Sequence, residues 1–178
     1  MPRIAREIDD ALKAVTLARC YFHSEGPQAQ ELDLQLWRLL KHGSAILRAE
    51  MADQLSEIPN GPPCTLRALA CDPDPEVASP VLQRWSAICD VAVAEMARCK
   101  GDDHLCAIAA RENLNEKIFG ILARRGGKKV LEVLAANRTA RSSAEGRHTL
   151  ERRLRRDVGA AVHSKLRQIR AALAYASH

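Results

Sequence analysis

The sequence predicts an all-α protein, a short α-solenoid of stacked helix pairs with one flanking helix at each end. Apolar residues make up 47% of the 178 residues but include only two Trp, two Tyr and two Phe, a composition suited to close helix packing. Apolar residues also recur at steps of three and four along most of the chain. We therefore expect one helical-repeat domain over residues 1–178, with an N-terminal helix in 1–25, repeats in 31–141 and a basic helical segment in 142–178.

The N-terminal third is expected to form three amphipathic helices. The first covers residues 4–22, and its apolar side chains fall on one face of the helix: Ile4, Ile8, Leu12, Val15, Ala18 and Phe22. SEGPQAQ interrupts this helix, and a second apolar stripe follows in residues 32–40. Ser44 is suited to cap a third helix, which PNGPP ends.

Downstream, short helical segments alternate with residues that start or stop helices. Asp74 is suited to cap the helix that follows it, and Pro75 to occupy the first helical position, where a missing N–H costs nothing. Further expected starts are Asp90, Asp102 or Asp103, and Asn115, and expected ends are Gly126 and Asn137. Helices of about 8 to 11 residues are marginal in isolation, so each must pack on its neighbours.

One predicted helix carries a proline in its interior. Pro80 removes a hydrogen bond to the carbonyl of Glu76, and its ring bends the helix. The first helices of HEAT-like units are often bent in this way, so we expect Pro80 to be structural. A strained bulge that binds a ligand is the alternative.

Two segments align as copies of one unit. When VASPVLQRW (77–85) is set above LCAIAARE (105–112), Pro80 falls over Ala107 and Arg84 falls over Arg111. Each copy is followed by a capping residue and a second helix, and weaker copies occur on both sides. A helix pair that recurs about every 25 to 30 residues is typical of an α-solenoid, although this spacing is shorter than that of typical HEAT or armadillo units.

The segments LACDPDPEVASPVLQRWSAICD and HLCAIAARENLNEKIFGILARRGGKKVLEVLAANRTARSS resemble the bacterial family known as domain of unknown function 2336. The shared features are an Asp-initiated helix with V-A-x-P-V-L, then A-I-A-x-R and a glycine-rich break. The resemblance covers roughly residues 35–143, and Trp85 departs from the pattern, in which a small or polar residue is more usual. The family has no established activity, so the resemblance implies a HEAT-like repeat fold and no catalytic residues.

The sequence contains no recognisable motif for catalysis, a cofactor or a metal. It lacks G-x-S-x-G, H-E-x-x-H and a phosphate-binding glycine loop. A metal site at Cys99, His104 and Cys106 would lack both paired thiolates and an evident fourth ligand. The six cysteines are expected to be reduced, buried and to behave as small hydrophobes. We therefore expect no enzyme activity, no cofactor and no metal.

Charge is distributed unevenly along the chain. Residues 1–137 hold 17 Lys and Arg against 19 Asp and Glu, whereas residues 138–178 hold 10 against 3. The cations that flank the apolar stripe of this tail are candidate binding residues: Arg152, Arg153, Arg155, Arg156, Lys165, Arg167 and Arg170. The tail has three interpretations: a capping helix with solvated charges, a contact surface for an acidic partner or a second copy of the chain, or a surface that binds nucleic-acid phosphates.

The longest stretch without Asp, Glu, Lys or Arg is IPNGPPCTL, of nine residues, against about 20 for a membrane-spanning helix. MPRIAREIDD has no apolar core of the kind a signal peptide needs. We therefore expect a cytoplasmic protein without membrane insertion.

The predicted function is a non-catalytic protein-binding module with a regulatory or scaffolding role. The alternative is a DNA-binding or DNA-repair protein that uses a basic surface of a HEAT-like scaffold.

Overall fold

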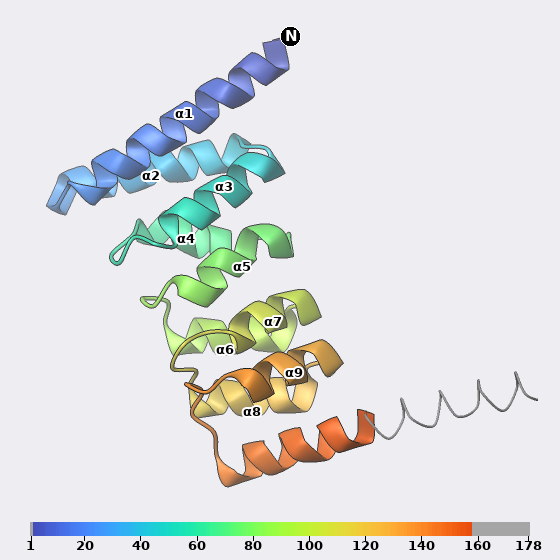
Figure 1. Cartoon of the computed structure of the whole chain (residues 1–178). Helices are drawn as coiled ribbons and strands as arrows, with labels where there is room; N and C mark the ends of the chain where they lie inside the picture. Colours follow the sequence, from blue (N-terminus) through green and yellow to red (C-terminus); the bar gives the residue numbers. More distant parts are fainter. Residues whose placement is uncertain (1, 158–178) are drawn as a thin grey trace, which may run out of the picture.

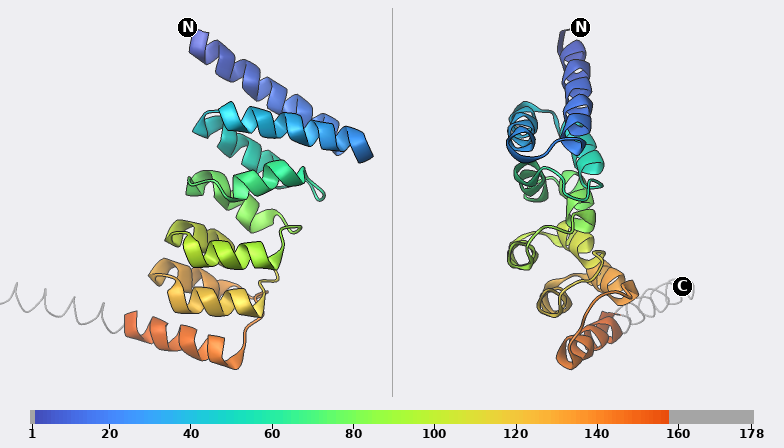
Figure 2. Two further views of the ribbon diagram at one scale, coloured as in Figure 1. Left: turned by 180° about the vertical axis from the view of Figure 1, so that it is seen from behind. Right: turned by 90° about the vertical axis from the view of Figure 1, so that its left-hand side faces the viewer.

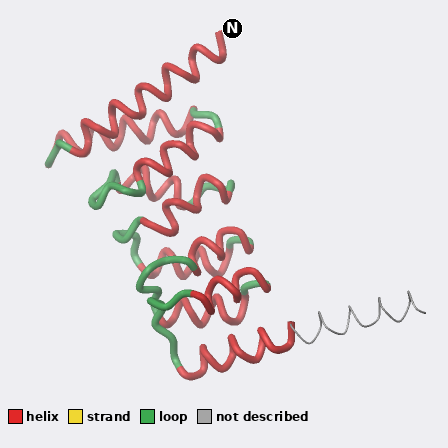
Figure 3. Tube along the Cα trace, in the orientation of Figure 1, coloured by secondary structure: helices red, strands yellow, loops and turns green. Residues whose placement is uncertain are grey.

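A computed structural model describes residues 2–157, with side chains from residue 7 onward, and every regular element in that range is a helix (Figures 1 and 3). The helices are α1 (Pro2–Phe22), α2 (Gly26–His42), α3 (Ala45–Leu55), α4 (Pro63–Ala70), α5 (Pro75–Arg84), α6 (Asp90–Cys99), α7 (Asp102–Ala109), α8 (Glu116–Arg125) and α9 (Lys128–Ala136). Residues 144–157 are also helical and are called the C-terminal helix below. The predicted all-α class is confirmed over the described range.

The helices lie in two columns (Figure 2). In one column α1 packs on α3, α3 on α5, α5 on α7 and α7 on α9; in the other, α2 packs on α4 and α6 on α8. The C-terminal helix continues the second column beyond α8. As a result, α1 and the C-terminal helix lie at opposite ends of the stack (Figure 1). Each helix therefore contacts helices that are close to it in the sequence.

The hydrophobic core extends along the whole stack. Leu36, Leu66, Leu82, Leu105 and Leu122 come from five different helices, are fully buried, and belong to one cluster of buried apolar residues. Complete burial of a leucine side chain is worth about 1.5–3 kcal/mol. These short helices are thus stabilised mainly by packing against each other, because isolated helices of this length are marginal.

The side chains of the N-cap residues cap α3, α5 and α8. The hydroxyl of Ser44 accepts a hydrogen bond from the backbone N–H of Leu47 at 3.3 Å, and Asn115 Oδ1 accepts from that of Lys117 at 2.7 Å. Asp74 Oδ1 accepts from the backbone N–H of Glu76 at 3.0 Å. These bonds satisfy amide groups that have no partner within their own helix.

Several other sequence signals also lie at helix ends. Pro75 is the first residue of α5 and Asp90 is the first residue of α6, where the N-cap is Cys89. Gly126 and Asn137 are the C-caps of α8 and α9. The short connections between helices follow directly from this arrangement of caps.

Helix α5 continues through Pro80 to Arg84. The hydroxyl of Ser79, the residue directly before the proline, donates a hydrogen bond to the carbonyl of Pro75 at 2.5 Å. Pro80 itself is half-buried, between the buried Ala78 and Val81. The proline therefore lies within a packed helix of the stack.

The apolar face of α1 that the sequence indicates is largely exposed, although Ala18 is half-buried and packs against the core. Ile8, Leu12 and Phe22 are 58%, 63% and 62% exposed, and Val15 is 38% exposed. The side chain that α1 buries against the stack is the small Ala14. Ala11, Leu17 and Ala18 are half-buried and pack against the core beside it.

The prediction of buried cysteines is also wrong. Five cysteines are exposed, namely Cys20, Cys64, Cys71, Cys89 and Cys99, and Cys106 is half-buried. All five exposed cysteines lie in the first or last turn of a helix or at a cap, where the chain reaches the surface. None of the helices within residues 2–157 is long and apolar enough to cross a membrane.

Candidate functional site

Arginine side chains connect successive helices of the first column. Arg84 donates to the carbonyl and carboxylate of Asp53 at 3.3 and 2.8 Å, at the end of α3. Arg111 donates to the carbonyl of Trp85 at 2.9 Å and to that of Leu82, at the end of α5. Carbonyl groups at a helix C-terminus lack partners within the helix and carry partial negative charge, so a cation there is stabilising.

Asn137 makes the equivalent contact one step further along the first column. Its amide donates to the carbonyls of Ala109 and Arg111 at 2.7 Å each, while its carbonyl oxygen accepts from the backbone N–H of Thr139 at 3.0 Å. Asn137, which ends α9, therefore also donates hydrogen bonds to carbonyl groups at the end of α7.

Cations connect the helices of the second column in the same way. Lys100 donates to the carbonyls of Cys71 and Asp72. Arg125 donates to the carbonyls of Ala97 and Lys100. Arg153 donates to the carbonyls of Ala123 and Arg124. The sequence separation of these bonds is 25 to 30 residues. Below, the donors of both columns are together called the carbonyl ladder: Arg84, Arg111 and Asn137 in the first column, and Lys100, Arg125 and Arg153 in the second.

The basic residues proposed from the sequence as a binding surface are not equivalent in the structure. Arg152, Arg155 and Arg156 are exposed on the C-terminal helix, whereas Arg153 is half-buried. Arg153 donates to the carbonyls of Ala123 and Arg124 at 3.1 and 2.7 Å and thus joins the C-terminal helix to α8. Lys165, Arg167 and Arg170 lie outside the described residues.

Of the residues considered for a metal site, His104 is buried and Cys99 is exposed. The Nε2 of His104 lies 3.1 Å from the carbonyl oxygen of Asp72. The thiol of Cys99 donates to the carbonyl of Glu95 at 2.8 Å. Between residues 2 and 157 no group of three or more His, Cys, Asp and Glu side chains is arranged to hold a metal ion.

A cleft of about 800 Å³ opens where the end of α1 meets α2 and α4. Its apolar lining includes Tyr21, Leu34, Trp37 and Pro63, and Arg67 lies at its polar edge. We call it the α2–α4 cleft. Tyr, Trp and Arg are the residues most enriched among those that carry the binding energy of protein interfaces.

The carboxylate of Asp33 fixes the geometry of this cleft. Asp33 is 4% exposed, and its two oxygens accept from the backbone N–H groups of Cys64 at 2.8 Å and Thr65 at 2.9 Å. The hydroxyl of Thr65 lies 2.7 Å from the same carboxylate. Helix α4 has Pro62 as its N-cap and no side-chain cap of its own, so a residue of α2 caps α4 and joins the two walls of the cleft.

Two polar groups of the cleft remain neutral at physiological pH. Burial raises the pKa of the Cys64 thiol, and the nearby Asp33 carboxylate raises it further while Arg67 opposes it. Burial also raises the pKa of Tyr21, with smaller contributions from Asp33 and Cys64. The cleft therefore presents a neutral phenol and a neutral thiol beside apolar surface.

The indole of Trp37 is held in place on α2. The ammonium group of Lys41 lies 4.0 Å from the centre of its ring, a favourable arrangement of a cation over an aromatic face. Trp37 is half-buried, so part of its ring remains available on the cleft wall. An ordered aromatic ring loses little conformational entropy on binding, which favours its use as a contact.

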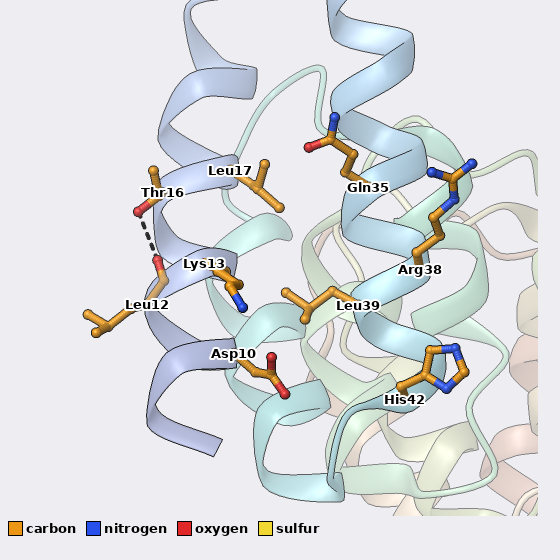
Figure 4. Close-up of a pocket in the computed structure, with 9 residues that line it drawn as sticks. All are labelled: Asp10, Leu12, Lys13, Thr16, Leu17, Gln35, Arg38, Leu39 and His42. Carbon is orange, nitrogen blue, oxygen red and sulfur yellow. Dashed lines mark hydrogen bonds between the residues drawn. The ribbon is translucent and has the colours of Figure 1, made fainter. Parts of the chain in front are cut away.

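A second hollow of about 580 Å³ lies between α1 and α2 (Figure 4). Leu17 from α1 and Leu39 from α2 point toward one another across it, whereas Leu12 points away from α2. The hollow is bordered by polar side chains such as Arg38 and His42. It is continuous with the exposed apolar face of α1, because Leu12 belongs to both.

The fold and this site define an all-helical protein whose stacked helices carry an aromatic cleft near one end. The model of a protein family described as an uncharacterised protein conserved in bacteria (DUF2336) matches residues 77–176, and the chain belongs to this family. The family was correctly identified from the sequence, but its span was not, because the match begins within α5 and includes the C-terminal segment. No curated protein and no solved structure matches the chain.

Proposed function

We propose that the chain is an α-solenoid of HEAT-like helix pairs that binds another protein through the α2–α4 cleft. The carbonyl ladder supports the solenoid, because the same kind of contact recurs between successive helices of both columns at separations of 25 to 31 residues. Such nearest-neighbour contacts are the property that defines repeat proteins. Extended helical stacks of this kind offer large surfaces for binding.

The observation that carries the proposed binding role is the combination of Tyr21, Trp37 and Arg67 around an apolar cleft. Its volume of about 800 Å³ is enough to take several side chains of a partner. The role we propose is regulatory or scaffolding and not catalytic. Asp33 is fully engaged in capping α4, and the Cys64 thiol has a raised pKa, so neither group is set up as a general base or nucleophile.

Substitution of Leu34 by Glu tests this proposal. Leu34 lies in the cleft and is 38% exposed, so Leu34→Glu introduces a charge into the docking surface with little effect on the core. We expect affinity capture from the native bacterium to recover a partner with the wild-type chain and to lose at least about 90% of it with Leu34→Glu, equivalent to roughly 1.4 kcal/mol or more.

Ile46→Glu is the matched control, because Ile46 is an exposed apolar residue of α3 outside the cleft. Capture by this variant should equal that of the wild type. Equal loss in both variants, or equal retention in both, would contradict binding through the cleft. Thermal unfolding of both variants verifies that each is folded.

The second candidate function is binding of duplex DNA through the exposed Arg152, Arg155 and Arg156. The excess of cations in residues 138–178 favours it. Phosphate contacts release counterions, so this function requires binding that weakens steeply between about 50 and about 200 mM salt. Gel-shift assays at the two salt concentrations, with nuclease treatment of captured material, separate it from the protein-binding proposal.

A further inference from the structure

The α2–α4 cleft exists because α2 begins before α4 does. The two helices run in the same direction, and α2, with 17 residues, extends beyond the start of the eight-residue α4 (Figure 1). Asp33 caps α4, so the part of α2 that precedes Asp33 extends past the start of α4. Gln30 and Leu34 are exposed here, and with Trp37 they form a stripe at steps of four and three residues on one side of α2.

Among the described residues that line the cleft, one carries an exposed charge, and that charge is positive. The charged residues of this lining are Asp33 and Arg67. Asp33 is 4% exposed, and its carboxylate accepts hydrogen bonds from Cys64 and Thr65. Arg67 is exposed, and its guanidinium makes no hydrogen bond or ion pair with any other described residue. A guanidinium presents five N–H donors in a planar fork that matches a carboxylate.

The neighbouring polar groups of the cleft also favour a partner that accepts hydrogen bonds. The phenol of Tyr21 makes no hydrogen bond with another described residue, and burial raises its pKa, so it remains a neutral O–H donor. The ammonium group of Lys41, over the ring of Trp37, adds a second positive charge beside the apolar wall. A carboxylate attached to an apolar group therefore matches the cleft, whereas a cation would be repelled by Arg67 and Lys41.

We propose, building on the proposed function of the cleft, that its partner is an acidic peptide segment. An Asp or Glu side chain of this segment pairs with Arg67, while neighbouring large apolar side chains pack on Leu34 and Trp37. Recognition through side chains suits the stack, because the described residues offer no sheet edge to which a peptide could add a strand. The apolar contacts supply most of the affinity, and the ion pair selects the partner.

Selection of short random peptides, displayed on phage, against the full chain tests this proposal without knowledge of the native partner. Peptides that bind the wild type should be enriched in Asp or Glu next to Leu, Ile or Phe. Selection against Arg67→Glu should reverse the charge preference and enrich Lys or Arg. Arg67 is exposed in the last turn of α4, so the substitution leaves the core unchanged, and circular dichroism verifies the fold.

Binding of one selected acidic peptide, followed by the fluorescence of Trp37, measures the contribution of the ion pair. The other tryptophan, Trp85, is 4% exposed and should not respond. Arg67→Ala should weaken binding about tenfold and Arg67→Glu about 100-fold. A peptide in which Lys replaces the acidic residue should bind Arg67→Glu more tightly than it binds the wild type.

Arg38→Glu is the matched control, because it makes the same change of charge on the surface of α2. Arg38 is exposed and lines the hollow between α1 and α2, not the α2–α4 cleft. The acidic peptide should bind this variant within about twofold of the wild type. Equal weakening by Arg38→Glu and Arg67→Glu would overturn the specific pairing with Arg67 and indicate a general attraction of the chain for acidic peptides.

The role of Leu34 separates failure of the acidic partner from failure of the binding site. Selected peptides that lose binding with Leu34→Glu but show no preference for acidic residues would overturn the acidic partner and leave the cleft as the binding site. Peptides that bind Arg67→Glu as tightly as the wild type would have the same meaning. If no selected peptide depended on Leu34, the proposed function of the cleft would itself be contradicted.

Discussion

Replacement of Asp33 by Ala is expected to destabilise the protein by about 3 kcal/mol. The carboxylate is buried and accepts hydrogen bonds from the backbone N–H groups of Cys64 and Thr65 at 2.8 and 2.9 Å. Its removal leaves two amide groups at the start of α4 without partners, and α4 has no cap of its own. Urea unfolding followed by circular dichroism measures the loss.

Asp53→Ala is the control for this substitution. Asp53 also accepts a charged hydrogen bond, from Arg84 at 2.8 Å, but both side chains are largely exposed to solvent. We expect it to cost about 0.5 kcal/mol or less. The role given to Asp33 is contradicted if the two variants are equally stable. Asp33→Asn should fall between them, because an amide has one acceptor oxygen for two N–H donors.

The second large effect is expected at Arg111. Arg111→Ala should destabilise the protein by about 2 kcal/mol, because it leaves the carbonyls of Leu82 and Trp85 unpaired in a partly buried position. Burial lowers the pKa of the Arg111 guanidinium, and the carboxylate of Asp90 acts in the opposite direction. The guanidinium nonetheless stays charged at neutral pH, so the variant loses two charge-assisted hydrogen bonds.

Arg84→Ala provides the comparison within the carbonyl ladder. Arg84 occupies the position equivalent to Arg111 one unit earlier, yet it is exposed, so its removal should cost less than about 1 kcal/mol. Thermal and urea unfolding of the two variants gives the difference directly. If Arg111→Ala destabilised the protein no more than Arg84→Ala, the hydrogen bonds from Arg111 to the end of α5 would not contribute to stability in the way described.

The sequence was sufficient to predict the helices and many of their ends, because local chemistry decides these. Asp74 and Asn115 cap helices through their own side chains, and Gly126 ends one by being a poor helix former. The alignment of Arg84 with Arg111 was also informative, since both donate to the end of an earlier helix. Local patterns of this kind do not depend on how the helices are arranged in space.

The orientation of α1 was not predictable from the same patterns. An apolar stripe shows that a segment forms an amphipathic helix, but it does not show whether the apolar face meets the rest of its own chain. In α1 the face that packs on the stack carries Ala11, Ala14 and Leu17, whereas Leu12 and Phe22 are exposed.

The α2–α4 cleft could not be identified from the sequence because its residues come from three helices. Tyr21, Trp37 and Arg67 are far apart in the chain and belong to no common motif. Only the packing of α2 on α4, fixed by Asp33, brings them together. The basic tail was visible in the sequence, but nothing there showed that Arg153 is used to join the C-terminal helix to α8.

The most direct test of a partner in the α2–α4 cleft uses Cys64 as a reporter. Its thiol lines the cleft and is exposed, and Cys89 and Cys99 are exposed on a different part of the stack. Alkylation of the purified complex should be slowed at Cys64 by about tenfold or more relative to the chain alone, while Cys89 and Cys99 react at unchanged rates. If Cys64 in the complex were alkylated as fast as in the chain alone, the partner would not occupy the cleft, and the proposed binding site would be wrong.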